Sequence, residues 1–163
     1  MPNWCWNKLE VGGNKKSLTE LKKFFKDGFS LETIDPTPKE LIDAPAIAPT
    51  KPSEVELPAW YNWRLDHWGT KWDLMHKEFK QGEATYLDFS DGVGRAEFHS
   101  AWTPPLIALK TLSAKFDKLI FKLKYADDQF NYQGEATIKG NEVWDVCKDV
   151  DQNEVMGNTQ TEW

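Results

Sequence analysis

The chain has 163 residues, of which 40% are hydrophobic and 13% aromatic, and this composition is typical of one folded domain and excludes a disordered chain. It contains no apolar run of about 20 residues, the length that a membrane-spanning helix needs, and its first residues lack the layout of a signal peptide. Cys5 and Cys147 form no CxxC motif, so we expect a cytoplasmic protein without a disulfide framework.

The net charge of −6 is concentrated at the C-terminal end. Residues 142–163 contain six acids and one base, a charge of −5, whereas the first 141 residues contain 20 acids and 19 bases, a charge of −1. A chain of this charge is a poor partner for duplex DNA or RNA unless a local basic face dominates.

The chain opens with a predicted strand and a predicted helix. Residues 4–11 alternate between two sets of side chains, the period of a strand. Ser17 and Glu20 have the spacing of a capping box, which predicts a helix that begins at Ser17 and ends near Gly28.

An irregular insert follows, because six prolines between residues 35 and 58 interrupt any regular element: Pro36, Pro38, Pro45, Pro49, Pro52 and Pro58. A helix is predicted to begin at Pro58 and to end at Gly69. Four apolar residues have the spacing of one buried helix face: Tyr61, Leu65, Trp68 and Trp72.

The second half of the chain predicts two hairpins, one on either side of a helix and a strand. Residues 84–90 and 95–102 are expected to pair across the turn at 91–94. A helix is expected to start at Thr103, followed by a strand at 119–126. A last hairpin is expected to turn at Gly140 and Asn141.

This order predicts an α+β fold, the β-α-β-β-α-β ferredoxin-like sandwich, in which two helices cover one face of an antiparallel sheet. A Pro-rich and partly helical insert, about residues 35–82, would follow the first helix, and the C-terminal hairpin would be an addition. We therefore expect one domain at residues 1–149 and an acidic tail at 150–163.

Three blocks of sequence resemble the YubB ferredoxin-like domain family: residues 1–13, which include MPNWC, residues 68–73, WGTKWD, and residues 98–105, which include SAW and PP. The resemblance extends to about residue 140. It implies a ferredoxin-like fold and an origin in bacteriophages or conjugative plasmids. The general role of that family is not established, so the resemblance implies no catalytic residue.

The WGTKWD block has a binding interpretation and a structural one. In a binding role, Trp68 and Trp72 would stack on a base or planar ligand and Lys71 would contact a phosphate. Thr70 and Asp73 would complete such a site. In a structural role, both indoles would pack between the insert and the sheet. The helical spacing favours the structural interpretation.

Two further surfaces are candidates for binding. The acidic end, with Trp144, Asp145, Asp149 and Asp151, could dock against a basic protein surface, although acidic tails also serve solubility. The outward face of the sheet could instead form a modest basic patch, made of Arg95, His99, Lys122 and Lys124. The chain lacks, however, the RNP signature of sheets that bind RNA.

Motifs for catalysis, metal binding and phosphate binding are absent from the sequence. Three histidines and two cysteines show no ligand spacing, and the loop beginning at Asp149 departs from an EF-hand at Glu154 and Gln160. No Walker or GxGxxG pattern occurs. Cys5 lacks a recognisable base. We therefore predict no catalytic residue, no metal and no cofactor.

These observations predict a non-enzymatic binding protein of a phage or plasmid, which would engage a host or defence protein such as a nucleic-acid-processing effector, as an anti-CRISPR-like or other counter-defence inhibitor does. The alternative is a protein that binds or sequesters a nucleotide or small ligand through the WGTKWD region. An enzyme is the third hypothesis, and direct binding of nucleic acid is less favoured than either binding role.

Overall fold

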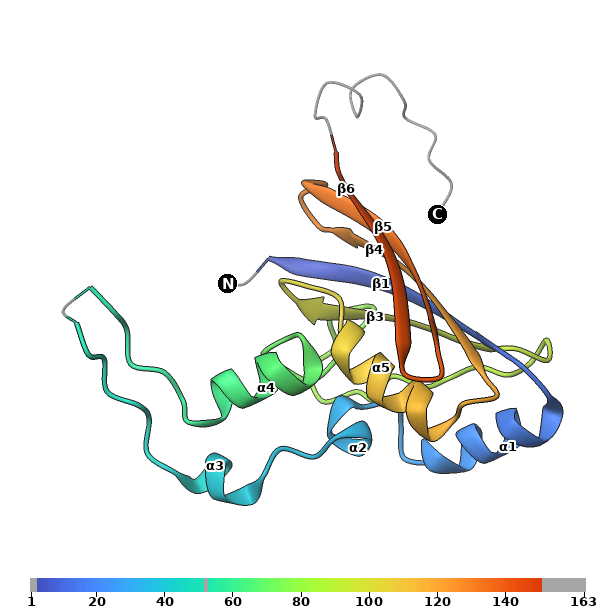
Figure 1. Cartoon of the computed structure of the whole chain (residues 1–163), viewed down its shortest axis with the longest axis horizontal. Helices are drawn as coiled ribbons and strands as arrows, with labels where there is room; N and C mark the ends of the chain where they lie inside the picture. The colour runs from blue at the N-terminus through green and yellow to red at the C-terminus, as the bar shows by residue number, and fades with distance from the viewer. Residues whose placement is uncertain (1–2, 52, 151–163) are drawn as a thin grey trace.

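The computed structural model describes residues 3–51 and 53–150. Six strands form one antiparallel sheet in the order β2-β3-β1-β4-β5-β6 (Figure 1). Their bounds are Trp4–Gly12 (β1), Met75–His76 (β2), Gly94–Ala101 (β3), Ile120–Asp127 (β4), Tyr132–Lys139 (β5) and Glu142–Asp149 (β6). The first four strands have the order of a ferredoxin-like sheet, and β5 and β6 extend it beyond β4, which confirms the predicted fold.

The central strand β1 pairs with β3 on one side and with β4 on the other. Its burial alternates strictly, because Cys5, Leu9 and Val11 face the core while the residues between them face outward. Outward-facing Glu10 lies between Arg95 of β3 and Lys122 of β4. This register leaves one charged face of the sheet uncovered.

The other face is covered by α1 (Lys15–Phe24) and α5 (Leu106–Lys115), as Figure 1 shows. The predicted starts differ from the observed ones, because α1 begins before Ser17 and α5 begins after Thr103. Asn14 caps α1 by accepting a hydrogen bond from the Ser17 backbone N–H at 2.8 Å, so Ser17 lies within the first turn. Thr103 does not cap α5, because its hydroxyl donates to the Gly69 carbonyl.

The edge of the sheet beside β3 differs from the prediction. Residues 84–90 were expected to form the outer strand, but among the described residues they pair with the backbone of β3 only through the bridge between Asp88 and Arg95. The outer strand is β2, whose two residues pair with Phe98 and His99. A second bridge joins Thr85 to Phe29 instead, so this segment lies between the sheet and the chain that follows α1.

The short helix α2 (Leu31–Ile34) precedes the insert, whose described part holds two helices, α3 (Lys39–Asp43) and α4 (Trp60–Trp68). Between α3 and α4 the chain forms an arm that projects from the body (Figure 1). A bridge between Ile47 and Leu57 closes the base of the arm. As predicted, α4 ends at Gly69, which has a left-handed φ of 81°.

The C-terminal hairpin turns at Gly140 and Asn141, as predicted, and both residues have positive φ, as a two-residue type I′ turn requires. Tyr125 of β4 crosses Gly134 of β5, where a Cβ atom would lie 2.3 Å from the tyrosine oxygen. The Tyr125 hydroxyl donates to Asp145 of β6 at 2.7 Å. The predicted acidic tail lies outside the described residues after Val150.

Candidate functional site

The WGTKWD block begins at a buried joint between the insert and the core. Trp68 is fully buried, and its indole N–H donates to the Asp35 carbonyl at 2.8 Å. The Arg64 guanidinium lies 4.7 Å from the Trp68 ring and forms an ion pair with Glu32 at 3.0 Å. These contacts hold α4 and the chain around α2 together, and we call them the insert joint.

Thr70 and Asp73 belong to the same joint. Thr70 is fully buried and donates its hydroxyl to the Ala101 carbonyl at 2.7 Å. Asp73 accepts backbone hydrogen bonds from Leu31 and Leu74, both at 2.8 Å, and a third bond from the Ser30 hydroxyl. The burial of Trp68 and Thr70 is incompatible with the binding role predicted for them, and the Asp73 carboxylate is already engaged by three donors.

The other two members of the block lie at the surface, in a cluster of aromatic residues. The Trp72 ring is 5.9 Å from Trp4, which is 5.6 Å from Phe79. The Lys71 ammonium lies 4.5 Å from the Trp72 ring and 5.5 Å from the Trp102 ring. We call this cluster of four rings and one cation the aromatic end.

The aromatic end is well exposed, and it gathers side chains from four separate segments. Exposed fractions are 37% for Trp72, 49% for Phe79 and 52% for Trp102. Trp4 opens β1, Trp102 follows β3, Trp72 follows α4 and Phe79 follows β2. Exposed aromatic rings of this size are enriched where proteins bind one another.

The backbone at two of these residues is strained. Phe79 has a φ of 55° and Trp102 a φ of 71°, a region that bulky L-residues avoid. The Thr103 N–H donates to the Ala101 carbonyl, so Trp102 is the centre of a γ-turn, and γ-turns with positive φ are rare. Strain of this kind is retained at binding and catalytic sites, where neighbouring contacts enforce it.

Contacts on both sides of Trp102 enforce its conformation. Its N–H donates to the Asn3 carbonyl at 2.9 Å, and its carbonyl accepts from the Tyr132 hydroxyl. Phe79 lies over His99, with their ring centroids 4.0 Å apart. Burial lowers the pKa of His99, and its Nδ1 atom has no hydrogen-bond partner among the described residues, and both features favour the neutral form of the ring under Phe79.

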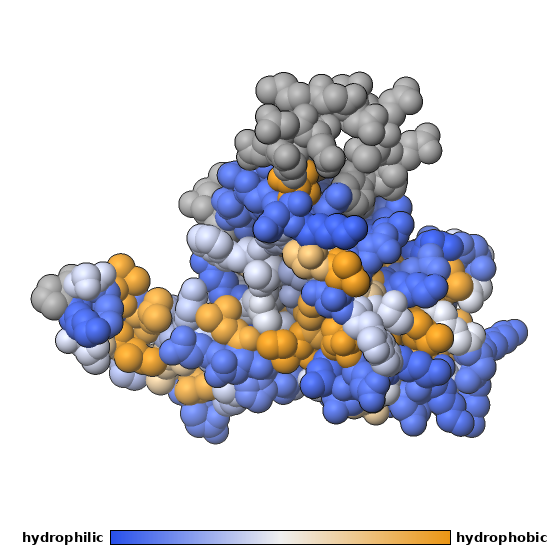
Figure 2. Space-filling view, turned by 45° about the horizontal axis from the view of Figure 1, so that its top comes forward, coloured by the Kyte–Doolittle hydropathy of each residue, from blue (hydrophilic) through white to orange (hydrophobic). Residues whose placement is uncertain are grey.

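An apolar groove of about 420 Å³ lies next to the aromatic end, between the start of α5 and the last two strands. Its walls include Leu106, Ile107, Tyr132 and Cys147. Tyr132 connects the groove to the aromatic end through its bond to Trp102. Figure 2 shows an apolar band across the face formed by α4 and α5.

The described residues predicted at the acidic end belong to β6, whereas Lys71 and Trp72 follow α4. Trp144 of β6 is 56% exposed on the uncovered face of the sheet, and Asp149 ends the same strand. Asp145 faces the other side, where it accepts the Tyr125 hydrogen bond and lines the apolar groove. Asp151 lies outside the described residues. The two sets of predicted residues therefore lie on different elements, and Asp145 borders the groove next to the aromatic end.

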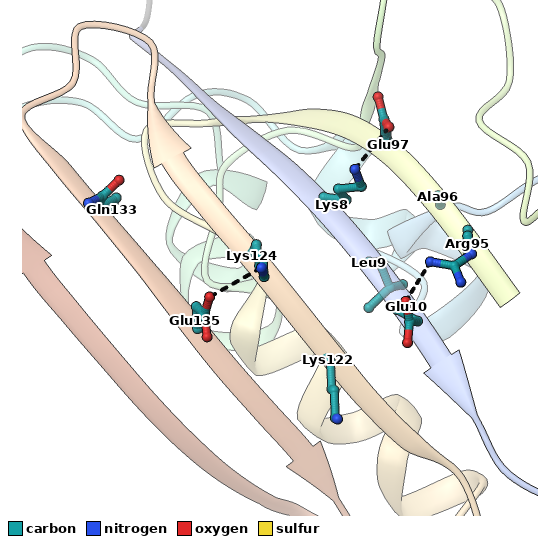
Figure 3. Close-up of a pocket in the computed structure, with 10 residues that line it drawn as sticks. All are labelled: Lys8, Leu9, Glu10, Arg95, Ala96, Glu97, Lys122, Lys124, Gln133 and Glu135. Atoms are coloured by element: carbon teal, nitrogen blue, oxygen red, sulfur yellow. Dashed lines mark hydrogen bonds and ion pairs between the residues drawn. The ribbon is translucent and has the colours of Figure 1, made fainter. Parts of the chain in front are cut away.

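The uncovered face of the sheet is electrically balanced, not basic. A hollow of about 430 Å³ there contains three ion pairs, drawn in Figure 3. They join Lys8 to Glu97 at 3.9 Å, Arg95 to Glu10 at 2.5 Å and Lys124 to Glu135 at 3.4 Å. Because these partners neutralise most of the predicted basic patch and His99 is buried, the sheet face is a weak candidate for an RNA site.

Other chemistry finds little support in the described residues. Burial raises the pKa of the Cys5 thiol to about 12, which makes Cys5 a poor nucleophile. Within residues 3–51 and 53–150, no three His, Cys, Asp or Glu side chains are grouped to hold a metal ion. None of the helices in the described part of the chain is both long and apolar enough to cross a membrane.

Sequence reasoning missed Trp4, Phe79 and Trp102 as site residues. Their left-handed backbone and their proximity depend on contacts between distant segments, which periodicity does not reveal. One signal was present: Trp4 is the first residue of a predicted strand and Trp102 is the last residue of another, and at the end of a strand a buried face does not by itself account for a large indole.

Comparison with known proteins places the chain in a family. The family model described as the ferredoxin-like domain in Api92-like protein matches residues 67–162. The chain belongs to this family. Its sequence matches none of the curated proteins. The finer resemblance to the YubB family, with its phage or plasmid origin, stays a prediction.

A crystal structure of the protein Api92 from Yersinia pseudotuberculosis is similar to this one, with a TM-score of 0.55. The similarity covers 93% of this chain and 99% of Api92, at 9% sequence identity. At this identity the likeness extends to the fold alone.

Proposed function

We propose that the protein is a non-enzymatic binding protein that engages a partner protein through the aromatic end. The observation that carries this proposal is the conformation of Trp102, which is half exposed and held in a strained backbone by Asn3 and Tyr132. Folding gains little from burying this indole, so a binding role accounts for the strain.

The surroundings of Trp102 suit a protein segment. A central aromatic anchor beside an apolar groove is the arrangement in which a few residues supply most of the binding energy. The groove walls Leu106 and Ile107 can accept an apolar side chain, and Lys71 can pair with an acid of the partner. The resemblance to the YubB family suggests a host or defence protein as this partner, for example a nucleic-acid-processing effector that the protein inhibits.

Affinity capture from a lysate of the host, with single-tryptophan variants, tests the proposal. The wild-type protein is expected to retain a partner that Trp102→Ala and Trp72→Ala lose. Trp144→Ala is the matched control, because Trp144 is similarly exposed but lies on the uncovered sheet face. Equal retention by all three variants would contradict the proposal, as would capture that depends on Trp144 alone.

A second candidate function is the binding of a nucleotide or planar ligand. It is favoured by Lys71, whose ammonium lies between the Trp72 and Trp102 rings and could meet a phosphate. A ligand that binds only the folded state raises the melting temperature. Thermal-shift measurements with mono-, di- and cyclic nucleotides should then show a rise that Lys71→Gln removes, and an unchanged melting temperature excludes this function.

A further inference from the structure

A second groove, on the opposite layer of the fold from the uncovered sheet face, runs along α1. Lys15, Thr19, Lys22 and Lys26 follow one another at spacings of four, three and four residues, which places them on one side of the helix and its C-terminal extension. Lys15 and Lys22 are separated by about 10 Å along the axis, at about 1.5 Å per residue. All three lysines are exposed.

The facing wall comes from the segment before β3. Tyr86, Leu87 and Phe89 line a hollow of about 480 Å³ together with Lys22 and Lys26. Phe89 and Lys22 also line a neighbouring hollow of about 400 Å³, which reaches Lys15. The two hollows therefore share part of their walls, and Figure 1 shows this segment beside α1. We call them together the lysine groove.

The charge in this groove is not neutralised. None of the three lysines forms an ion pair in the part of the chain that the structure describes, in contrast to Lys8 and Lys124 on the sheet face. Of the acids in the facing segment, Asp91 pairs with Arg95, whereas Asp88 accepts two hydrogen bonds from Ser90 and keeps its charge.

Aromatic residues stand opposite this row of cations. Tyr86 is 61% exposed, more than any ring of the aromatic end. A cationic track with exposed rings beside it is the combination used to bind single-stranded nucleic acid without sequence preference, since the cations follow the phosphates and the rings stack on bases. An acidic peptide matches the cations but leaves Tyr86 without a role.

We propose that the lysine groove binds single-stranded nucleic acid. The backbone phosphates lie along Lys15, Lys22 and Lys26, and a base stacks on Tyr86. Because the whole chain carries a net charge of −6, a polyanion is repelled by the rest of the surface and is confined to this groove. This activity is separate from the aromatic end and goes beyond the proposed function.

Fluorescence anisotropy with labelled 12-residue oligothymidine and oligouridine, at low salt, tests the proposal. The triple variant K15Q/K22Q/K26Q is expected to bind at least tenfold more weakly than the wild type. The control K39Q/K51Q/K77Q removes the same charge from exposed lysines elsewhere and should stay within twofold of the wild type. The slope of log affinity against log salt should fall by about 2 in the triple variant, at about 0.7 per lost phosphate contact.

Tyr86 separates nucleic acid from an acidic peptide. Tyr86→Ala should weaken oligonucleotide binding by about fivefold or more, whereas Tyr86→Phe, which keeps the ring, should bind like the wild type. Three results would overturn the proposal: no binding at low salt, an equal loss in the control, or an oligoglutamate that competes fully while Tyr86→Ala has no effect. Trp102→Ala should leave oligonucleotide binding unchanged, so failure here is distinguishable from failure of the aromatic end.

Discussion

The insert joint and the aromatic end contain the same kinds of side chain in opposite environments. Trp68 is fully buried and donates a hydrogen bond, and Arg64 lies close to its ring. Trp102 is 52% exposed in a strained backbone, and Lys71 lies near its ring. A nearby cation therefore does not indicate whether a tryptophan has a structural role or a binding role. Burial and hydrogen bonding distinguish a structural indole from one that is available to a partner.

The largest expected effect comes from Trp68→Ala. The variant loses a fully buried indole, so the free energy of unfolding should fall by about 3–5 kcal/mol. Trp72→Ala is the matched control in the same block and should cost about 1 kcal/mol or less, because that side chain is partly exposed. Urea denaturation of both variants measures the difference, and similar losses would abolish the distinction between joint and surface.

Asp73→Ala should have the next largest effect. Its carboxylate accepts three hydrogen bonds, two of them from the backbone N–H groups of Leu31 and Leu74. Their removal should lower the free energy of unfolding by about 2 kcal/mol. Asp66→Ala removes an exposed carboxylate of α4 and should change the free energy of unfolding by less than about 0.5 kcal/mol. The midpoints of urea denaturation of the two variants measure the difference. An Asp73→Ala midpoint equal to that of Asp66→Ala would contradict the role of Asp73 in the insert joint.

The pH dependence of stability tests the buried side of β1, directly below the aromatic end. The pKa of the Cys5 thiol is 9.0 in the unfolded chain and is raised to about 12 by burial. Above pH 9 the unfolded chain loses this proton and the folded protein keeps it, so stability falls as the pH rises, by about 1 kcal/mol between pH 8 and pH 10.

Cys5→Ala should reduce this loss, because it removes the buried thiol. The raised pKa of Tyr125 does not depend on Cys5 and contributes equally in both proteins, whereas part of the rise in the pKa of Tyr132 comes from Cys5 and disappears with it, which changes the pH dependence in the same direction. Denaturant titrations at pH 8 and pH 10 measure it. An identical pH dependence in wild type and variant would show that Cys5 is accessible to water.

The smallest effect concerns the strained backbone at Trp102. Glycine adopts positive φ without the penalty that other residues have, so Trp102→Gly should be about 1 kcal/mol more stable than Trp102→Ala. Both lose the indole and should lose the partner equally. If alanine proved as stable as glycine in thermal denaturation, the backbone at this position would not be strained.

The sheet and its two covering helices were predictable because their signals are local. Leu119, Phe121 and Leu123 alternate with outward-facing residues, and the turn at Gly140 has its own signature. The outer strand was not predictable, since Met75 and His76 are too few to show a period and residues 84–90 show the alternation without pairing.

Two of the five residues of the aromatic end, Lys71 and Trp72, were also predicted from the sequence. The WGTKWD block was distinctive, and helical spacing correctly indicated that Trp68 is buried. The same spacing wrongly included Trp72, because α4 ends at Gly69 and the period has no meaning beyond that residue. Trp4, Phe79 and Trp102 meet only after the sheet has formed, and contacts at such distances in sequence leave no trace in a local pattern.

Fluorine NMR of protein labelled with 5-fluorotryptophan, with signals assigned by single Trp→Phe variants, tests the central distinction most directly. On addition of a soluble gadolinium chelate, the Trp102 and Trp72 signals should broaden strongly and the Trp68 signal should stay sharp. Broadening of Trp68 to the same extent, or protection of Trp102, would contradict the division between a buried insert joint and an aromatic end open to a partner.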